Sequence, residues 1–570
     1  MHPRLWKRTP SARAPRPYSP YSRVQLMTRT AMACAALGAV QGAQSMELDS
    51  GNPDLSLRFD NTVKASTMYR LRNADPALTQ SFSAQGAPQA INFNAGDQNF
   101  SQRGFVSERL DLLSEFDAVY QGRFGLRISA AGWYDRAYQR GTDAPNDPTN
   151  GQSPYNQFAD HTQEESGRKA ELMDAFVFGS TTLANGGKLS GRLGQHSLLY
   201  GESLFFGDNG IAAAQGPTDV SKLLSSPNAQ FKEIAIPVPQ LSGQWQVAPN
   251  FSLGGYVQFQ WKESRVPAAG SYFSTANVPW GATGPEFVGI PASIPGIGGN
   301  YVAQPGADDK PRNSGQFGLQ AKWRLDETDL GFYYARYHDK TGQLYSRLNP
   351  GAPATDSSWF YVFGSDIDVA GASVSRSVGD FNVSAEASLR DNMPLNVNNA
   401  VYFGPNGTAR PAYPTGRTAH INLSTIASFG PNFLAKESGL AAELAWNRVL
   451  HKNDPDNEID QGRTRDASIV QFVYTPTYRQ VFDGVDINVP VGLRYTLSGR
   501  SSVTAWGPKG TGSANIGIEG NFRNTWQFGL NYTRYIGTSK PFNDYSTGQF
   551  SDGNPLGDRN FISLNLRRTF

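Results

Sequence analysis

The sequence predicts an all-β protein, a transmembrane antiparallel β-barrel of about 18 strands, with 16 as the alternative. Its segments of about ten residues alternate apolar and polar side chains, as barrel strands do when one face meets lipid and the other meets water. The segment 251–262 places Phe251 and Leu253 on one face and Ser252 and Gln258 on the other. The same alternation recurs in residues 314–325 and 440–447.

The connections between these segments alternate between short and long along the chain. Short ones lie near residue 122 and at 185–188, 248–250, 326–329, 379–380, 430–438, 479–485 and 521–524. Long ones are residues 72–104, 139–167, 202–240, 265–313, 341–357, 391–416, 452–465, 503–511 and 537–557. Bacterial barrels have short periplasmic turns and longer extracellular loops. We therefore expect both ends of the barrel domain on the periplasmic side.

The first 45 residues have the composition of a secretory signal peptide. They contain seven Arg or Lys residues and no acidic one, followed by an apolar run at 31–40 and small residues at 43–45. This order predicts a signal peptide at residues 1–45 and a barrel domain at residues 46–570. Without the leader, 44 basic residues face 49 acidic ones. The resulting net charge of −5 argues against nucleic acid as a partner.

The single cysteine, Cys34, lies in the apolar part of the leader, where a lipoprotein attachment site is the competing interpretation. The remaining chain therefore has no residue for disulfides or thiolate metal sites. Its apolar runs are shorter than the ~20 residues of a membrane-spanning helix. A secreted β-sandwich or β-helix is the soluble alternative. Aromatic clusters at 133–134, 332–334 and 532–535 favour the barrel, because such clusters form interfacial girdles.

The last ten residues, FISLNLRRTF, form a closing strand with Ile562, Leu564 and Phe570 on one face. A terminal strand of this kind resembles the sorting signal that the outer-membrane barrel assembly machinery reads, so we expect that machinery as a partner. Arg568 departs from the pattern, since it lies on the lipid side. Near the interface such a charge can extend toward water at a cost of about 0 to 1 kcal/mol.

Alternation disappears in residues 202–240, here called the hatch segment. Pro217, Pro227, Pro237 and Pro239 would each remove a hydrogen-bond donor from a strand, and Asp219 is a candidate helix cap. We expect this segment to fold inward as a hatch that narrows the lumen. The alternative is an extracellular loop packed on its neighbours. The candidate constriction residues are Gly201, Glu202, Gly207, Asp219, Pro227, Lys232, Glu233 and Pro237.

Charged residues on the polar faces of two strands are expected to line the lumen. These candidates are Lys322, Arg324, Glu386 and Arg390. Charges inside a barrel either tune selectivity or brace a plug. The long loop 265–313 carries exposed apolar candidates, namely Tyr272, Phe273, Trp280 and Phe287. These side chains either pack loop against loop or capture an apolar ligand.

Catalytic and metal-binding signals are weak, and we expect neither an enzyme nor a cofactor. His420, Asn422 and Ser424 share one strand face, but a polar lumen face accounts for them. The stretch at 201–210 lacks the G-x-S-x-G spacing of a nucleophile elbow. An acidic loop at 454–460 lacks the glycine of an EF-hand, so a solvated loop is favoured over a divalent-cation site.

The hatch segment carries a recognisable set of motifs. They are GESLFFGDNGI from Gly201, PTDVSKL from Pro217, PNAQFKE from Pro227 and IPVPQL from Ile236. Further matches are YARYHDK, DIDVAGASVSRSVGDFNVSAEASLRDNMPL and DRNFISLNLRRTF. Across essentially the whole chain after the leader, the sequence resembles a proteobacterial outer-membrane family, domain of unknown function 1302. This resemblance implies an outer-membrane barrel, often associated with catabolism of hydrophobic compounds such as steroids and other lipids, without established catalytic residues.

The expected function is an integral outer-membrane channel that admits hydrophobic small molecules, steroid- or lipid-like, into the periplasm. The alternatives are an anchor or assembly component of an envelope export system, a general porin and, last, a lipid-active esterase. Expected partners are outer-membrane lipid, lipopolysaccharide and the hydrophobic small molecule. The sequence leaves the substrate, the direction of transport and the oligomeric state open.

Overall fold

The computed structural model describes residues 46–147, 154–184, 186–279, 281–290, 292–353, 356–397, 400–454, 460–544 and 548–570. The predicted signal peptide lies outside the described residues. The described chain belongs to one compact unit, Ser45–Phe570.

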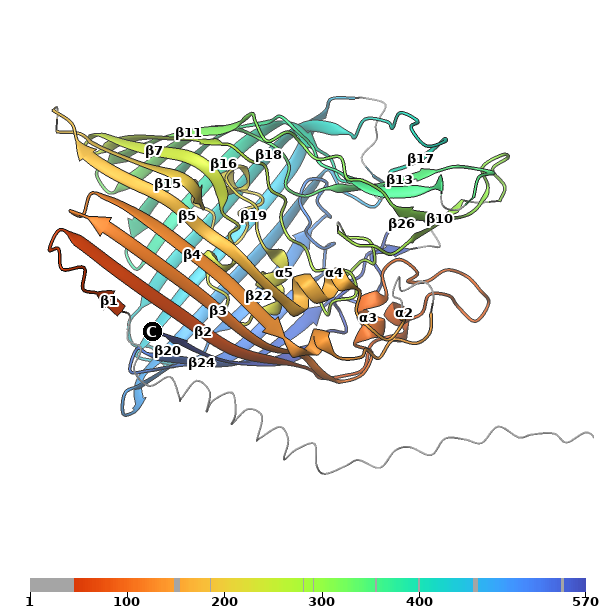
Figure 1. Ribbon diagram of the computed structural model, residues 1–570, viewed down its shortest axis with the longest axis horizontal. Helices are drawn as coiled ribbons and strands as arrows, with labels where there is room; N and C mark the ends of the chain where they lie inside the picture. The colour runs from red at the N-terminus through yellow and green to blue at the C-terminus, as the bar shows by residue number, and fades with distance from the viewer. Residues whose placement is uncertain are drawn as a thin grey trace, which may run out of the picture. The chain divides into compact units, whose positions relative to one another are not determined.

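Eighteen antiparallel strands form the closed wall of this unit, as predicted (Figure 1). In chain order they are β2 (Leu55–Arg70), β3 (Gly104–Tyr120), β4 (Phe124–Asp135), β5 (Arg168–Thr182), β6 (Lys188–His196), β7 (Val238–Ala248), β8 (Phe251–Gln258), β11 (Gln316–Leu325), β12 (Thr328–Tyr337), β15 (Ile367–Val378), β16 (Phe381–Pro394), β18 (Thr415–Phe429), β19 (Glu437–Lys452), β20 (Asp466–Phe482), β22 (Val491–Ser498), β23 (Gly512–Phe522), β24 (Trp526–Ile536) and β27 (Phe561–Thr569). Pairing of β27 with β2 closes the ring.

Two short strands extend this wall. β1 (Met46–Leu48) pairs with the first residues of β2. β21 (Val485–Asn488) continues the hairpin between β20 and β22. Pro490 separates β21 from β22, because proline cannot donate the ladder hydrogen bond expected at that position.

The predicted alternation decides which side chains face inward. On β18, His420, Asn422 and Ser424 are buried on the lumen side, whereas Ile421 and Leu423 are 39% and 47% exposed on the outside. Exposed leucine, isoleucine, valine and phenylalanine side chains recur on the outer face of strands around the wall. A continuous apolar outer surface of this kind is suited to lipid.

The connections follow the predicted parity. β15 and β16 are joined only by residues 379–380, with Gly379 at a φ of +58°, a left-handed conformation that suits a tight hairpin turn. β2 and β3, by contrast, are separated by residues 71–103. Short turns gather at the left end of the barrel in Figure 1, and long loops gather at the right end.

The long loops contain strands of their own, which the sequence analysis does not anticipate. A five-stranded sheet has the order β17-β13-β14-β10-β9. Its members are β9 (Glu286–Ile290), β10 (Gly299–Pro305), β13 (Gln343–Leu348), β14 (Ser358–Val362) and β17 (Ala400–Phe403). A second sheet pairs β25 (Asn543–Asp544) with β26 (Gln549–Phe550).

Helical elements are short and lie outside the wall strands. They are α2 (Pro76–Thr79), α3 (Ala95–Asn99), η1 (Arg136–Gln139), α4 (Asp160–Thr162), η3 (Gln163–Gly167), η4 (Ile211–Ala214), α5 (Val220–Ser225) and α6 (Phe231–Ile234). Among the described residues, none of these helices has the length and apolar character needed to cross a membrane.

Only alternate members of the predicted aromatic girdle face outward. Tyr134 and Phe332 are exposed on the outer surface, but Trp133 and Tyr333 are buried inside the barrel. Successive side chains of a strand point to opposite faces, so two adjacent aromatic residues cannot both belong to an outer girdle. Arg568 lies on the lipid side as expected, with its guanidinium over aromatic rings at the barrel end.

Candidate functional site: a hatch bound across the barrel

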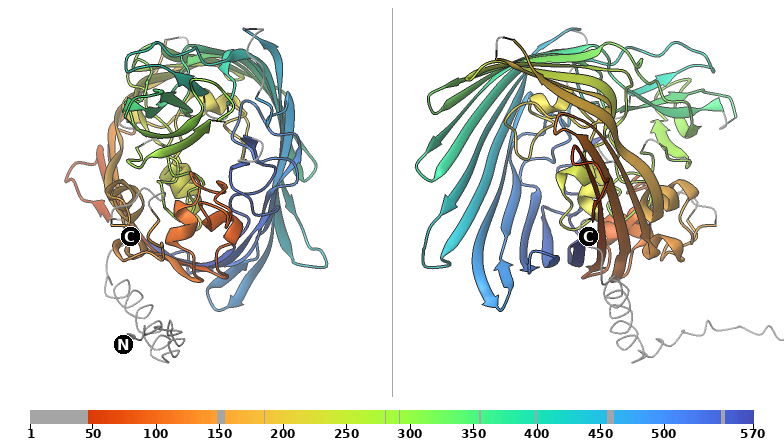
Figure 2. Two further views of the ribbon diagram at one scale, coloured as in Figure 1. Left: turned by 90° about the vertical axis from the view of Figure 1, so that its right-hand side faces the viewer. Right: turned by 60° about the vertical axis from the view of Figure 1, so that its left-hand side comes forward.

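The hatch segment leaves the wall after β6 and folds inside the ring of strands, carrying η4, α5 and α6 (Figure 2). Its last three residues differ from the prediction, because β7 already begins at Val238. Pro239 lies in the wall opposite Gln195. A proline is tolerated in the second position of a strand, and its carbonyl still accepts a hydrogen bond from the N–H of Phe259 at 2.9 Å.

Glu386 of β16 binds both ends of the first hatch loop. Its carboxylate accepts hydrogen bonds from the main-chain N–H groups of Glu202 (2.7 Å) and Ile211 (2.5 Å). Two glycines permit this approach. Gly201 has a φ of +96° and a Cβ there would overlap the carboxylate, while a Cβ on Gly210 would lie 2.7 Å from its other oxygen.

Glu443 of β19 binds the middle of the same loop. One carboxylate oxygen accepts hydrogen bonds from the N–H groups of Leu204 (3.2 Å), Phe205 (2.5 Å) and Phe206 (2.9 Å). The other oxygen accepts from the side-chain amide of Asn422 at 2.7 Å. Consecutive N–H groups form a concavity that suits an anion, so a single wall carboxylate satisfies a turn that would otherwise lack partners.

Arg390 of β16 supplies the complementary charge. Its guanidinium is buried and donates to the carbonyl oxygens of Asp208 (3.2 Å), Asn209 (2.8 Å) and Gly210 (2.8 Å). The planar guanidinium has five donors, which lets it satisfy several carbonyls of one turn. The loop is therefore held by carboxylates at its amides and by an arginine at its carbonyls.

The three residues weighed as a catalytic constellation belong to the same anchor. The side chain of Asn209 donates to Asn422 at 2.9 Å, and its oxygen lies 3.0 Å from the Nδ1 of His420. Ser424 donates to the carbonyl of Glu202 at 3.1 Å. These contacts account for all three side chains as partners of the hatch segment.

The second half of the hatch segment is bound to a different part of the wall. Lys64 of β2 donates to Ser226 at 2.6 Å and lies 3.5 Å from the carboxylate of Glu233. Arg567 of β27 contacts the same carboxylate at 3.2 Å and the carbonyl of Asn228 at 2.8 Å. A further ion pair joins Lys232 to Glu115 of β3.

Asp219 begins α5 as predicted, with its carboxylate accepting the N–H of Lys222 at 2.7 Å. The same carboxylate pairs with Arg265 at 2.5 Å. Arg265 also contacts Glu171 of β5 at 2.8 Å. The ammonium of Lys222 lies 4.7 Å from the ring of Trp133, which explains why this aromatic side chain faces inward.

These two anchors lie on opposite sides of the barrel. Counted along the wall, β3 is the second strand and β18 is the twelfth of 18. Strands about nine places apart face one another across a closed ring of this size. The hatch segment therefore spans the lumen, from β16, β18 and β19 on one side to β2, β3 and β27 on the other.

An aromatic cluster supports the segment between the anchors. Tyr200 and Ile211 pack with Tyr256 of β8 and Tyr333 of β12. The Tyr200 ring centroid lies 5.6 Å from that of Tyr256 and 6.4 Å from that of Tyr333. The hatch segment thus has apolar contact with a third part of the wall.

The four predicted lumen charges have different roles. Glu386 and Arg390 are buried beneath the hatch segment. Lys322 is exposed and its ammonium lies 3.4 Å from the carboxylate of Glu202. Arg324 is exposed near the short turn after β11 and pairs with Asp329 at 2.7 Å. Three of the four charges therefore contact the hatch segment, and Arg324 does not.

The remaining constriction candidates make smaller contributions. A Cβ on Gly207 would make only ordinary contact, 3.4 Å from the Cβ of Ala212. Pro227 lies two residues after the end of α5. The carbonyl of Pro237 accepts a hydrogen bond from the ammonium of Lys262 at 2.9 Å. Glu443, Asn209 and Lys64 were missed as site residues, since strand alternation predicts their face but not their partner.

The apolar loop candidates lie in different environments. Tyr272 and Phe273 are buried with Phe100, Tyr138 and Phe561, which is the packing of loop against loop and wall. Phe287 lies in β9, and its N–H donates to Asn92 at 3.0 Å. Trp280 is outside the described residues.

A buried ion pair accompanies the aromatic cluster of the loops. Arg559, before β27, contacts Asp97 of α3 at 2.5 Å, and both side chains are almost fully buried. Arg70 contacts Asp558 nearby at 2.6 Å. The first extracellular loop is therefore fastened to the last one, a contact that no local sequence pattern predicts.

The predicted acidic loop is described only in part, because residues 455–459 lie outside the described residues. Within the described chain, no three His, Cys, Asp or Glu side chains are grouped in a way that could hold a metal ion.

A closed 18-strand antiparallel barrel with an apolar outer face and a segment folded into its lumen is a porin-like outer-membrane channel fold. The chain belongs to the family described as "Protein of unknown function (DUF1302)", whose profile matches residues 26–570. A search of curated proteins found no match.

Solved structures with a related fold include three outer-membrane proteins. OccAB2 of Acinetobacter baumannii is 10% identical, with a TM-score of 0.40 and coverage of 90% of this chain and 98% of that one. The outer membrane channel DcaP of the same organism is 9% identical, with a TM-score of 0.36 and coverage of 93% and 100%. OpdK from Pseudomonas aeruginosa is 11% identical, with a TM-score of 0.37 and coverage of 90% and 98%.

Proposed function

We propose that this protein is an outer-membrane channel that takes up hydrophobic small molecules, steroid- or lipid-like, into the periplasm, with the hatch segment as its constriction. The observation that carries the proposal is a segment bound to opposite walls whose own exposed side chains are apolar. Leu204, Leu223 and Phe231 are 40%, 50% and 56% exposed.

The outer face of the barrel supports the membrane location. Leu319 and Leu389 are more than half exposed there, as is typical of side chains that contact lipid rather than a protein core. Burying such a side chain away from water is favourable by about 1.5–3 kcal/mol, so a wall of them is stable only in an apolar surrounding.

The charge distribution of the hatch segment supports an apolar substrate. Glu233 lies between Lys64 and Arg567, and Asp219 is paired with Arg265, so these charges are committed to anchoring. Channels for ions and polar solutes present charged rings at their constrictions. Here the exposed large side chains are Leu223 and Phe231.

The anchoring contacts place the constriction at the level of the membrane. Glu386 is five residues from Phe381, the first residue of β16 after its short turn. At about 3.3 Å per residue, this is roughly 17 Å along a tilted strand. The hatch segment therefore crosses the lumen well inside the barrel, where a passing solute must meet it.

The test is uptake of radiolabelled steroid and of long-chain fatty acid by intact cells. Strains carry the protein, a null allele, or a Leu223→Ser/Phe231→Ser double variant, with equal surface expression verified. We expect loss of uptake in the null strain and a reduced rate in the double variant. Entry of a small hydrophilic sugar serves as the control and should be equal in all three. Unchanged steroid and fatty-acid uptake in the null strain would refute the proposal, and equal loss of the sugar would instead indicate a general porin.

A further inference from the structure

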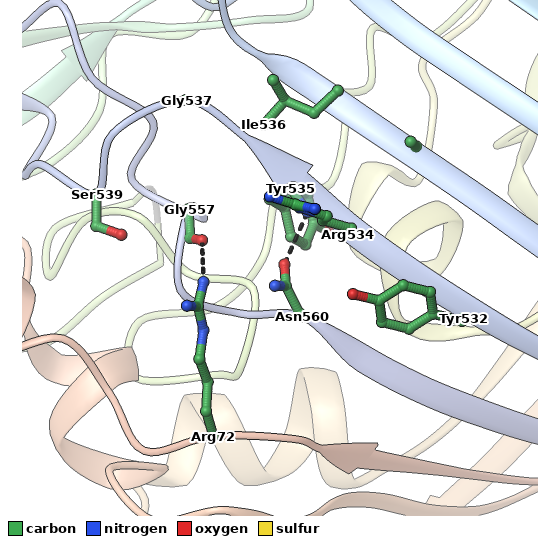
Figure 3. Close-up of a pocket in the computed structure, with 10 residues that line it drawn as sticks. Arg72, Tyr532, Arg534, Tyr535, Ile536, Gly537, Ser539, Gly557 and Asn560 are labelled. Atoms are coloured by element: carbon green, nitrogen blue, oxygen red, sulfur yellow. Dashed lines mark hydrogen bonds between the residues drawn. The ribbon is translucent and has the colours of Figure 1, made fainter.

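A cavity lies on the outer surface of the barrel at its extracellular rim, apart from the hatch segment (Figure 3). It has a volume of about 650 Å³, which is in the range of small-molecule sites. Arg72 follows β2 and Asn560 precedes β27, whereas Tyr532 and Arg534 belong to the last turns of β24. The site therefore lies at the seam where the first and last strands of the wall meet.

The alternation of β24 places these side chains on the lipid side. Leu530 is exposed on the outer face, and Tyr532 and Arg534 follow it with the same parity. Tyr532 is opposite Ile562, another outward residue. At about 3.4 Å per residue, Arg534 is roughly 14 Å further along the strand than Leu530. An order of leucine, tyrosine and arginine matches the order of acyl chain, interface and headgroup.

Both arginines of the cavity lack an acidic partner among the described residues. The guanidinium of Arg72 donates to the carbonyl of Gly557 at 3.0 Å, and that of Arg534 makes neither a hydrogen bond nor an ion pair within the described chain. Each guanidinium has five donors, so most of them remain available to an anion. Ala514 is opposite Arg534 in the neighbouring strand, and its small side chain leaves space beside the guanidinium.

Other outward arginines near the same rim are neutralised. Arg336 contacts Asp368 at 2.7 Å, Arg417 contacts Asp391 at 3.3 Å, and Arg448 contacts Asp466 at 3.3 Å. The rim of β12, β18 and β19 is thus composed of ion pairs. The seam between β24 and β2 carries two positive charges without a counter-charge from the described protein.

We propose that this cavity binds the phosphate group of a phosphorylated, acylated glycolipid of the outer leaflet. The inference rests on the outer-membrane location within the proposed function, but not on the transported substrate. Arg72 and Arg534 would bind the phosphate, because guanidinium groups match phosphate oxygens in charge and geometry. Tyr532 lies at the interface, and the exposed Leu530 and Ile562 contact the acyl chains below it.

The test uses the purified protein in an uncharged detergent and native mass spectrometry. Three probes are compared: bis-phosphorylated lipid A, the same lipid A after removal of its phosphates, and inorganic phosphate. The variants are Arg72→Gln, Arg534→Gln and the double substitution. Arg523→Gln is the matched control, since Arg523 lies at the opposite end of the β23–β24 hairpin and has no acidic partner in the described chain.

We expect each single substitution to weaken binding of bis-phosphorylated lipid A about tenfold, as loss of one charge-assisted contact implies. Arg523→Gln should bind as the unchanged protein does, and dephosphorylated lipid A should bind weakly and equally to all variants. Arg72→Lys/Arg534→Lys should retain more affinity than the glutamine pair, because it keeps both charges.

Three results would overturn the inference. They are unchanged binding of bis-phosphorylated lipid A by the double glutamine variant, equal affinity for the dephosphorylated lipid, and saturation by inorganic phosphate alone. The last result would identify a site for free anion rather than for lipid. Uptake of steroid is a separate measurement, so a failure here leaves the channel proposal intact, and the reverse also holds.

Discussion

The carboxylate of Glu443 accepts a hydrogen bond from the main-chain N–H of Phe206 at 2.9 Å, although the two residues are 237 positions apart in the chain. A strand residue of the wall thereby satisfies a backbone group that the hatch segment cannot satisfy by itself. Buried N–H groups without partners cost about as much as a lost hydrogen bond, so the wall and the hatch segment stabilise one another.

Substitution Glu443→Gln should loosen the hatch segment without unfolding the barrel. The change removes the charge that three N–H groups share, and charge-assisted hydrogen bonds contribute about 1.5–3 kcal/mol each. We expect a clear increase in open probability or conductance in planar-bilayer recordings. Glu437→Gln is the control, because Glu437 lies on the same strand in an exposed ion pair with Arg479. Identical recordings for the two variants would contradict the anchoring role.

Substitution Gly201→Ala should weaken protection of the first hatch loop. Its φ of +96° is unfavourable for alanine, and the new Cβ would overlap the Glu386 carboxylate. A strained position of this kind costs about 1–3 kcal/mol. Hydrogen exchange of residues 202–211 should become faster in this variant. Gly207→Ala, which meets no close atom in the described chain, should exchange at the rate of the unchanged protein; slower or equal exchange in Gly201→Ala would refute the prediction.

The extracellular five-stranded sheet should lose stability as the pH rises. Burial raises the pKa of Glu286 in β9 to about 7 from an ordinary value of 4.5, against the opposing effect of its hydrogen bond with Ser346. A carboxyl group whose pKa is higher in the folded state stabilises that state while it is protonated. The sheet should therefore be most stable below about pH 4.5 and lose this contribution up to about pH 7.

Limited proteolysis of intact barrels between pH 4 and pH 8 checks this dependence, with cleavage sites in residues 286–305 and 343–362 mapped by mass spectrometry and rates corrected for the protease's own pH profile. Glu286→Gln carries no ionisable group and should make the cleavage rate independent of pH in that window. A pH dependence that persists in Glu286→Gln would assign the effect to another group.

Substitution Asp97→Asn should destabilise the extracellular loop layer strongly. The change leaves Arg559 buried without its anionic partner, and loss of one partner of a buried pair costs about 3–5 kcal/mol. Thermal unfolding of the loop layer, followed by the fluorescence of its tyrosine residues, should shift to lower temperature. Asp552→Asn removes the partner of Lys540 in an exposed pair and should change stability by at most about 1 kcal/mol. Equal shifts for the two variants would show that the buried pair has no special weight.

Substitution Ser424→Ala should leave ester hydrolysis at the level of buffer alone, as for the unchanged protein. Its hydroxyl donates to the carbonyl of Glu202, and Asn422 and His420 are likewise engaged with the hatch segment. Purified protein assayed with phospholipid and short-chain ester substrates provides the measurement. Hydrolysis that disappears in Ser424→Ala would restore the esterase alternative.

Several features of the wall followed from local pattern. The inward face of His420, Asn422 and Ser424 could be predicted because side chains alternate along a strand. The number of strands followed from counting short and long connections. The helix begun by Asp219 followed from the residue types that cap helices. Such features depend on neighbours within a few residues.

Other features were predicted incompletely, for reasons specific to each. Pro239 was placed off the wall because proline lacks a donor, yet the second position of a strand tolerates it. Trp133 was assigned to an outer girdle by its aromatic character, but its inward position is explained by Lys222 above its ring. The sheet of β9, β10, β13, β14 and β17 joins three loops, and its pairing has no signature within any one of them.

By itself the sequence determined the class of fold, the faces of its strands and the existence of a segment that could not belong to the wall. Periodicity and turn chemistry act over a few residues, so a single chain displays them directly. Only the tertiary structure decided that Glu386, Glu443 and Arg390 bind this segment on one side of the lumen while Lys64 and Arg567 bind it on the other. Contacts between residues hundreds of positions apart arise when the barrel closes, because closure alone brings the opposite walls within reach of one segment.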